Sequence, residues 1–165
     1  MYQVKYIDNT FLINLINDTG IIKNNIKLTL PSNKYFNNDI INKEGNIISS
    51  QVRENVIIGY LSTSAIGYFG KNKNKKKIYK ATALNYKLPN FRVPYNGKLK
   101  GKLLVIFKFI HWKEKLPTAT IIDVLGFFSE ENIIKAYIYY FGLSLKKIKI
   151  NPINNILEAT ISRIN

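Results

Sequence analysis

The sequence contains no cysteine, one histidine, one tryptophan and only ten acidic residues among its 165 positions. The absence of cysteine excludes a disulfide scaffold, a thiolate metal site and a cysteine nucleophile. No apolar run approaches the roughly 20 residues that cross a bilayer, and the N-terminus lacks the basic and then apolar layout of a signal peptide. We therefore expect an intracellular, cytoplasmic protein without a membrane partner, with a nuclear or organellar location left open.

Carboxylates are too few and too scattered to suggest metal-assisted catalysis. Phosphodiester cleavage by two metal ions needs several carboxylates that converge on the cations. Asp123 lies between two apolar residues, as an outward residue of a strand would, and Glu130 and Glu131 suit a helix start. His111 has only Glu114 as a nearby acid, which favours a surface or stacking role over that of a general base. The sequence predicts no enzyme activity, no cofactor and no metal site.

Positive charge is present in large excess. Lysine and arginine number 25, of which three are arginine, and the formal net charge is +15. Such a field favours a polyanionic partner, above all nucleic acid. The alternative is that abundant lysine, asparagine and isoleucine reflect an AT-rich genome. Hydrophobic residues make up 46% of the chain and aromatic residues 13%, which is typical of a folded domain.

Three regions can be distinguished along the chain. Residues 1–50 predict a small β-rich region or partial barrel, with a strand over 26–30 that Pro31 ends. Residues 51–145 predict strands over 56–61, 65–69, 78–84, 102–110 and 118–125, with basic or glycine-containing loops. Short strands in this arrangement are typical of a five-stranded barrel of the oligonucleotide-binding (OB) or cold-shock type. Residues 146–165 form a basic tail with one more strand around 156–161.

One helix is predicted after the barrel. Ser129 is a suitable N-cap, and Gly142 stands where a C-cap is expected. Between them, apolar residues recur at helical spacing and define one stripe: Ile133, Ile134, Tyr137, Ile138 and Phe141. We interpret this stripe as packing against the core rather than as a groove for a partner.

A set of motifs follows the predicted strands of the barrel. The first motif is Lys87-Leu88-Pro89, with Arg92 three residues later. A Leu-x-Gly-Lys turn over 99–102 and then Trp112 follow. The last motif is Pro117 ahead of Leu125-Gly126. In these motifs the chain resembles the cold-shock region of the RNase II family, which includes RNase R and the catalytic subunit of the eukaryotic exosome. The resemblance spans residues 52–143, departs at Ala119, where the family has glycine, and does not extend clearly into the first 50 residues.

The resemblance implies an RNA-binding barrel. It also implies that a catalytic domain with magnesium-binding aspartates should follow, yet no segment of that size follows Leu143 in this sequence. Single-stranded RNA is held by a basic groove with aromatic faces for the bases. The candidate binding residues are Tyr60, Tyr68, Phe69, Lys71, Lys73, Lys75, Lys76, Lys77, Tyr79 and Arg92.

Each of these candidates has an alternative explanation. Because neighbouring side chains of a strand point to opposite faces, half of the aromatic residues belong to the core. The lysines of residues 71–77 could equally form a solvated loop. We favour Tyr68 and the lysine loop over Phe69, and we place Tyr86 on the same strand as Tyr79.

The predicted function is that of a non-catalytic protein that binds RNA, preferably single-stranded, as a subunit of a larger RNA-processing, transcription or ribonucleoprotein complex with other protein subunits. One alternative is a small basic structural protein of a ribosome-like assembly. Another is an interaction subunit that positions a separately encoded catalytic chain. In that case, the apolar helix face over 133–141 would be partly exposed.

Overall fold

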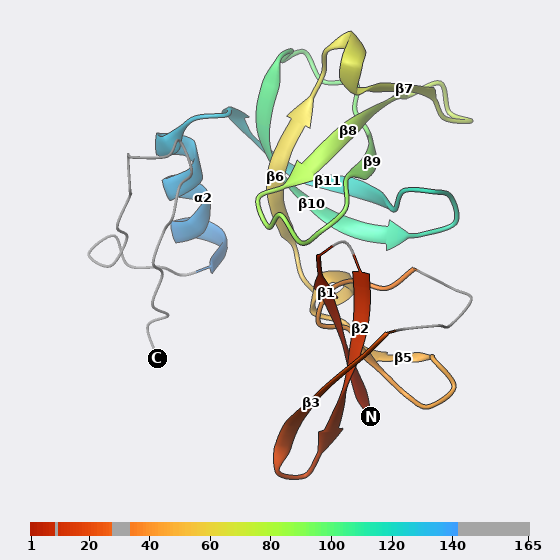
Figure 1. Cartoon of the computed structure of the whole chain (residues 1–165). Helices are drawn as coiled ribbons and strands as arrows, with labels where there is room; N and C mark the ends of the chain where they lie inside the picture. The colour runs from red at the N-terminus through yellow and green to blue at the C-terminus, as the bar shows by residue number, and fades with distance from the viewer. Residues whose placement is uncertain (9, 28–33, 142–165) are drawn as a thin grey trace.

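The protein consists of two β-sheets and a C-terminal helix, seen in a computed structural model that describes residues 1–8, 10–27 and 34–141 (Figure 1). The first sheet has the strand order β3-β2-β1-β4-β5. Its strands are β1 (Tyr2–Ile7), β2 (Thr10–Asn17), β3 (Gly20–Lys27), β4 (Ile40–Ile41) and β5 (Ile47–Ser49). The strand predicted over 26–30 is the end of β3, and its residues 28–30 lie outside the described part of the chain.

The second sheet closes into a five-stranded barrel of the OB type. The short helix α1 (Gln51–Glu54) precedes this sheet. The strands of the sheet are β6 (Ile57–Ser62), β7 (Tyr68–Lys71), β8 (Lys77–Ala83), β9 (Phe91–Pro94), β10 (Lys102–His111) and β11 (Thr118–Phe127). The ring runs β6-β10-β11-β9-β8 and closes through the antiparallel pair of β6 and β8, whereas β9 and β11 are parallel. The predicted barrel is confirmed.

One of the predicted strands does not belong to the ring. Residues Ala65–Gly67 form a 3₁₀ turn, and β7 begins only at Tyr68 and pairs with β8 outside the closed barrel. The ring takes β9 instead, which lies in the segment that carries the Leu-Pro motif. Gly59 allows the closure, because a Cβ there would lie 2.2 Å from the carbonyl oxygen of Thr82. The strands of a small barrel approach too closely at this point for any larger residue.

The interior and exterior of the barrel follow from the alternation of side chains. Leu103, Val105 and Phe107 of β10 point into the core, where Phe91 and Phe107 lie edge to face. The intervening Leu104 and Ile106 point outward and are buried by the helix α2 (Glu130–Phe141). Residues 103–107 of β10 are therefore buried on both sides of the strand.

The helix begins where the sequence predicts it. The backbone N–H of Asn132 donates to the Ser129 hydroxyl over 3.2 Å, and Ile133 is buried against the barrel. Tyr140 donates to the Asp123 carboxylate over 2.8 Å, and this bond raises the pKa of Tyr140 to about 12. Asp123 thus anchors the helix to β11. The predicted C-cap Gly142 and the basic tail lie outside the described residues.

The aromatic side chain of Phe36 packs the first sheet against the barrel. Phe36 precedes β4 and is buried in the barrel core, with ring centroids 5.9 Å from Phe91, 5.4 Å from Phe109 and 4.9 Å from Trp112. The guanidinium group of Arg53 lies over the rings of Phe36 and Phe109, at 5.0 and 4.6 Å from their centroids. The N-terminal sheet therefore shares its packing with the barrel, and it lies directly beneath the barrel in Figure 1.

A buried carboxyl group fixes the same junction. Asp39 accepts hydrogen bonds from the Phe36 N–H over 2.8 Å and from the Ser50 hydroxyl over 2.5 Å, and its Oδ2 lies 3.8 Å from Nε of Arg53. Burial raises the pKa of Asp39, and the two hydrogen bonds and Arg53 offset part of that rise. These contacts hold Phe36 and the start of α1 in one position.

Within the described ranges, no helix combines the length and the apolar content that a bilayer crossing requires.

Candidate nucleic-acid interface

A hollow of about 430 Å³ lies on the outside of the barrel, and we call it the barrel groove. Its floor is formed by Ile78 of β8, by Arg92 and Pro94 of β9, and by Thr118 of β11. One end is bordered by the turn between β7 and β8, and the other by the loop between β10 and β11. In OB folds, oligonucleotides bind on the face of the second and third strands, between these same two loops.

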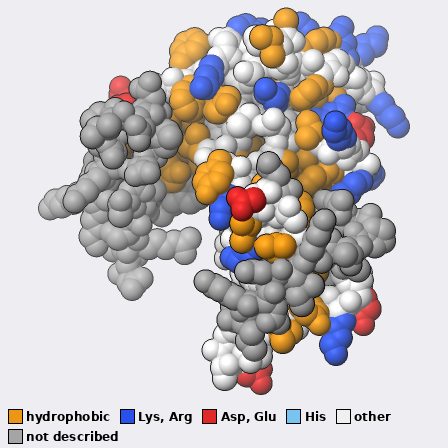
Figure 2. All heavy atoms as spheres, viewed as in Figure 1, with side chains coloured by type: hydrophobic (Ala, Val, Ile, Leu, Met, Phe, Trp, Pro, Cys, Tyr) orange, Lys and Arg blue, Asp and Glu red, His pale blue; other side chains and the backbone are white. Residues whose placement is uncertain are grey.

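The turn over residues 71–77 carries five lysines, and Asn72 gives it a defined shape. The Asn72 side-chain oxygen accepts the backbone N–H groups of Asn74 and Lys76, each over 3.0 Å, and the Asn72 backbone closes the turn with Lys75 and Lys76. The lysine side chains are exposed and form no ion pair within the described part of the chain. Figure 2 shows Lys and Arg gathered in this upper right part of the molecule.

Arg92 and Glu114 form an ion pair across the groove. The Arg92 side chain is half-buried, and its backbone N–H donates to the Pro117 carbonyl over 2.8 Å. Glu114 is more exposed and lies on the loop after β10. A phosphate group in the groove would compete with Glu114 for the guanidinium group, because both are anions that Arg binds in the same way.

Three of the aromatic candidates lie on β7 and β8, and they differ in access. Tyr79 is 5% exposed and belongs to the barrel core, so its ring is not available to a base. Tyr68 packs on Tyr79 with ring centroids 5.7 Å apart and remains 42% exposed, and Phe69 is 39% exposed. Tyr68 and Phe69 do not line the barrel groove, but they are accessible beside the lysine turn and remain candidate stacking residues, whereas Tyr79 does not.

Tyr60 lies at a different place. Its ring is 5.3 Å from that of Phe128, and the ammonium group of Lys102 is 4.1 Å from both ring centroids. This cluster lies where the chain enters α2, and Tyr60 does not line the barrel groove. Tyr86 is not on the strand of Tyr79 as predicted, because β8 ends at Ala83.

Several groove residues were not assigned to binding from the sequence. Asn72 shapes the lysine turn, Glu114 faces Arg92, and His111 lines the groove with its Nδ1 buried and without a hydrogen-bond partner. His111 lies at the end of β10 and is half-buried, and the surface or stacking role expected from the sequence stays a prediction. No sequence signal paired Arg92 with Glu114, because 22 positions separate them.

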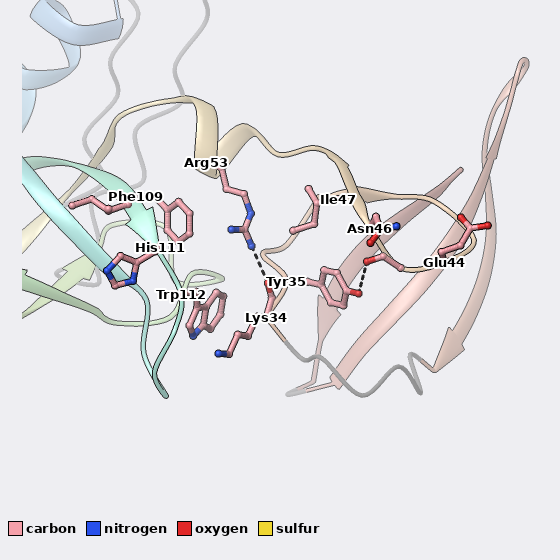
Figure 3. A pocket seen from close by; sticks show the side chains of 11 residues that line it. Lys34, Tyr35, Glu44, Asn46, Ile47, Arg53, Phe109, His111 and Trp112 are labelled. Atoms are coloured by element: carbon pink, nitrogen blue, oxygen red, sulfur yellow. Dashed lines mark hydrogen bonds between the residues drawn. The ribbon is translucent and has the colours of Figure 1, made fainter.

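A second hollow, of about 610 Å³, lies between the barrel and the N-terminal sheet, and we call it the junction hollow (Figure 3). Arg53, His111 and Trp112 line its barrel side, and Tyr35 lines the side of the β4–β5 hairpin. Arg53 donates to the carbonyl of Lys34 over 2.9 Å, and Tyr35 donates to the carbonyl of Gly45 over 2.7 Å. His111 borders both this hollow and the barrel groove, so the two are adjacent.

In the part of the chain that the structure describes, no group of three or more His, Cys, Asp or Glu side chains is placed to hold a metal ion.

Comparison of the sequence with protein-family models gives no match, and comparison with curated proteins gives none either. The candidate function therefore rests on the geometry of the barrel groove and on the motifs between residues 87 and 126.

Proposed function

We propose that this protein binds single-stranded RNA in the barrel groove and does not cleave it. The observation that carries the proposal is the placement of the lysine turn. Five exposed lysines without ion-pair partners in the described chain lie on the turn at one end of the barrel groove, and two of them, Lys71 and Lys73, line the groove itself. Phosphates of a strand crossing that face would lie between the lysines and Arg92, and each neutralised phosphate would release counterions.

Binding rather than catalysis is supported by the composition of the groove. Its one carboxylate is Glu114, and its other charged side chains are Lys71, Lys73 and Arg92. Such a set attracts phosphates but offers no cluster of carboxylates for two metal ions. Tyr68 and Phe69, exposed beside the turn, supply aromatic faces on which bases stack without sequence preference.

The resemblance to the cold-shock region of the RNase II family supports the same proposal. It further suggests that the protein acts as a subunit of a larger RNA-processing, transcription or ribonucleoprotein complex. The alternative of an interaction subunit needs the apolar stripe on α2 to be partly exposed. Ile133 is buried against the barrel, whereas Ile134 and Ile138 are half-buried, so the helix leaves that alternative open.

Fluorescence anisotropy of a labelled single-stranded RNA of about ten nucleotides, at low and at physiological salt, tests the proposal. The variant in which Lys73, Lys75 and Lys76 are replaced by Gln should bind at least about tenfold more weakly at low salt. The slope of log affinity against log salt concentration should be less negative by about 2, since each lost phosphate contact changes that slope by about 0.7.

The control variant replaces Lys43, Lys98 and Lys108 by Gln, and these three lysines are exposed but lie outside the lysine turn and the groove. It removes the same charge and should lose less affinity. Equal losses in the two variants would show that the chain binds as a polycation without a defined groove. Equal affinity for duplex competitor RNA would contradict the preference for single strands.

A further inference from the structure

A third hollow, which we call the aromatic pocket, lies beneath the barrel where the β1–β2 hairpin meets the loop between β8 and β9. Its volume is about 240 Å³. Five aromatic side chains line it: Tyr6, Phe11, Tyr35, Tyr86 and Trp112. Pockets for drug-sized ligands measure roughly 300–1,000 Å³, so this one has the size for a single ring system.

The pocket has a distinctive rim. Tyr86 is 86% exposed, although it is a large aromatic residue. The Asn85 side chain accepts the N–H of Lys87 over 3.1 Å, and the Asn85 carbonyl accepts the N–H of Leu88 over 3.1 Å. This tight turn presents Tyr86 and Lys87 at the pocket while the following Leu88 packs on the barrel core. The ring is therefore accessible to a ligand in the pocket.

The charge of the residues that line the aromatic pocket indicates which class of ligand it can bind. In a cage for a quaternary ammonium group, the faces of the protein's aromatic rings attract the cation. Here the one charged lining residue is Lys87, no carboxylate lines the pocket, and the net charge of the chain is +15. A cation is disfavoured in this field. A flat neutral ring attached to an anionic phosphate matches both the aromatic faces and the lysine.

The pocket also lies close to the proposed RNA site. The barrel groove and the junction hollow share His111, and the junction hollow and the aromatic pocket share Tyr35 and Trp112. All three hollows therefore lie around the end of β10. Trp112 is held in place by packing on Phe36 and by the bond from its Nε1 to the Lys115 carbonyl over 3.3 Å.

We infer that the aromatic pocket receives one unpaired base of the RNA strand that crosses the barrel groove, with Tyr86 and Trp112 contacting the base and Lys87 its phosphate. This inference rests on the proposed RNA binding and adds a base-binding subsite to it. Base stacking on an aromatic residue changes affinity by about fivefold to a hundredfold per base, so the subsite should be a main source of the preference for single strands.

Trp112 is the one tryptophan of the chain, so its emission reports directly on the pocket wall. A ten-nucleotide oligouridylate should change the emission of Trp112. An abasic strand of the same length and phosphate number should bind more weakly and leave the emission unchanged. A proline-rich peptide should also leave it unchanged; a response to that peptide and not to RNA would overturn the inference in favour of a peptide groove.

Tyr86→Ala should weaken binding of the oligouridylate at least about fivefold and abolish the Trp112 response. Tyr139→Ala is the matched control, because Tyr139 is 80% exposed on α2 and lines none of the three hollows. Thermal melting should be the same for both variants and the wild type. If RNA binds by anisotropy but Tyr86→Ala keeps the Trp112 response, the base-binding subsite is overturned and the proposed function stands. The same holds if RNA binds the wild type without any change in Trp112 emission. Absence of RNA binding overturns the proposed function as well.

Discussion

At the scale of single residues, alternation along a strand predicts that some aromatic side chains are core, but it does not say which. Tyr79 is buried because the odd-numbered residues of β8, with Ala81 and Ala83, face the barrel interior. Its neighbour Tyr68 reaches the surface only because β7 lies outside the closed ring. That distinction depends on strand pairing across the barrel, which no local pattern in the sequence records.

The ion pair of Arg92 and Glu114 gives a prediction at the same scale. Glu114→Gln should strengthen binding of the ten-nucleotide RNA by up to about fivefold, since it removes a competing anion and an exposed ion pair is worth at most about 1 kcal/mol. Anisotropy titration at low salt measures the change. Asp18→Asn removes an equal charge from the turn between β2 and β3, outside all three hollows, and is the control. Weaker binding by Glu114→Gln would mean that the pair positions Arg92 for RNA.

At the scale of elements, the sequence predicts the helix and most of the barrel strands but misplaces the segment 65–69. The first part of that segment is a 3₁₀ turn because Gly67 packs against the backbone of Ser62, where a Cβ would lie 2.4 Å from the Ser62 carbonyl oxygen. The short strand β9 has weak local patterning and is recognisable mainly through the Leu-Pro motif that precedes it. Tertiary contact rather than propensity decides both cases.

The shape of the lysine turn is a prediction for an element. Asn72→Ala should lower RNA affinity by about fivefold, because the turn loses two hydrogen bonds worth about 1 kcal/mol each and must then be ordered on binding. The salt dependence should not change, since every lysine remains. Asn74→Ala, in which only the exposed side chain is lost, serves as the control. If Asn72→Ala binds like the wild type, lysine number matters and lysine placement does not.

At the scale of the whole molecule, the sequence predicts a β-rich region before a barrel but not their attachment. Phe36 lies in a stretch rich in asparagine and turn-forming residues, where a surface loop is expected. Its partners Phe91, Phe109 and Trp112 are more than 50 positions away, and contacts of such separation leave no periodic signal. The junction hollow and the aromatic pocket both arise from this contact, so neither could be predicted.

The junction gives a prediction about stability. Phe36→Ala should lower the free energy of unfolding by about 3–5 kcal/mol, as expected when a fully buried aromatic side chain is removed from a core. Urea denaturation followed by Trp112 emission and by circular dichroism measures it. Phe127→Ala is the control, because that ring is 57% exposed and should cost about 0.5 kcal/mol. A small loss in Phe36→Ala would show that the N-terminal sheet does not depend on the barrel.

The position of Phe36 early in the chain also matters during synthesis on the ribosome. A ribosome that makes this chain releases the N-terminal sheet first, and 76 residues must follow Phe36 before Trp112 is added. At about 5–20 residues per second, that interval lasts about 4–15 s. During this interval the barrel core that buries Phe36 has not yet been synthesised, so the first sheet is present while the Phe36 side chain is still uncovered. The nascent chain therefore presents an unprotected aromatic residue for seconds, which makes it a natural substrate for chaperones that bind exposed apolar side chains.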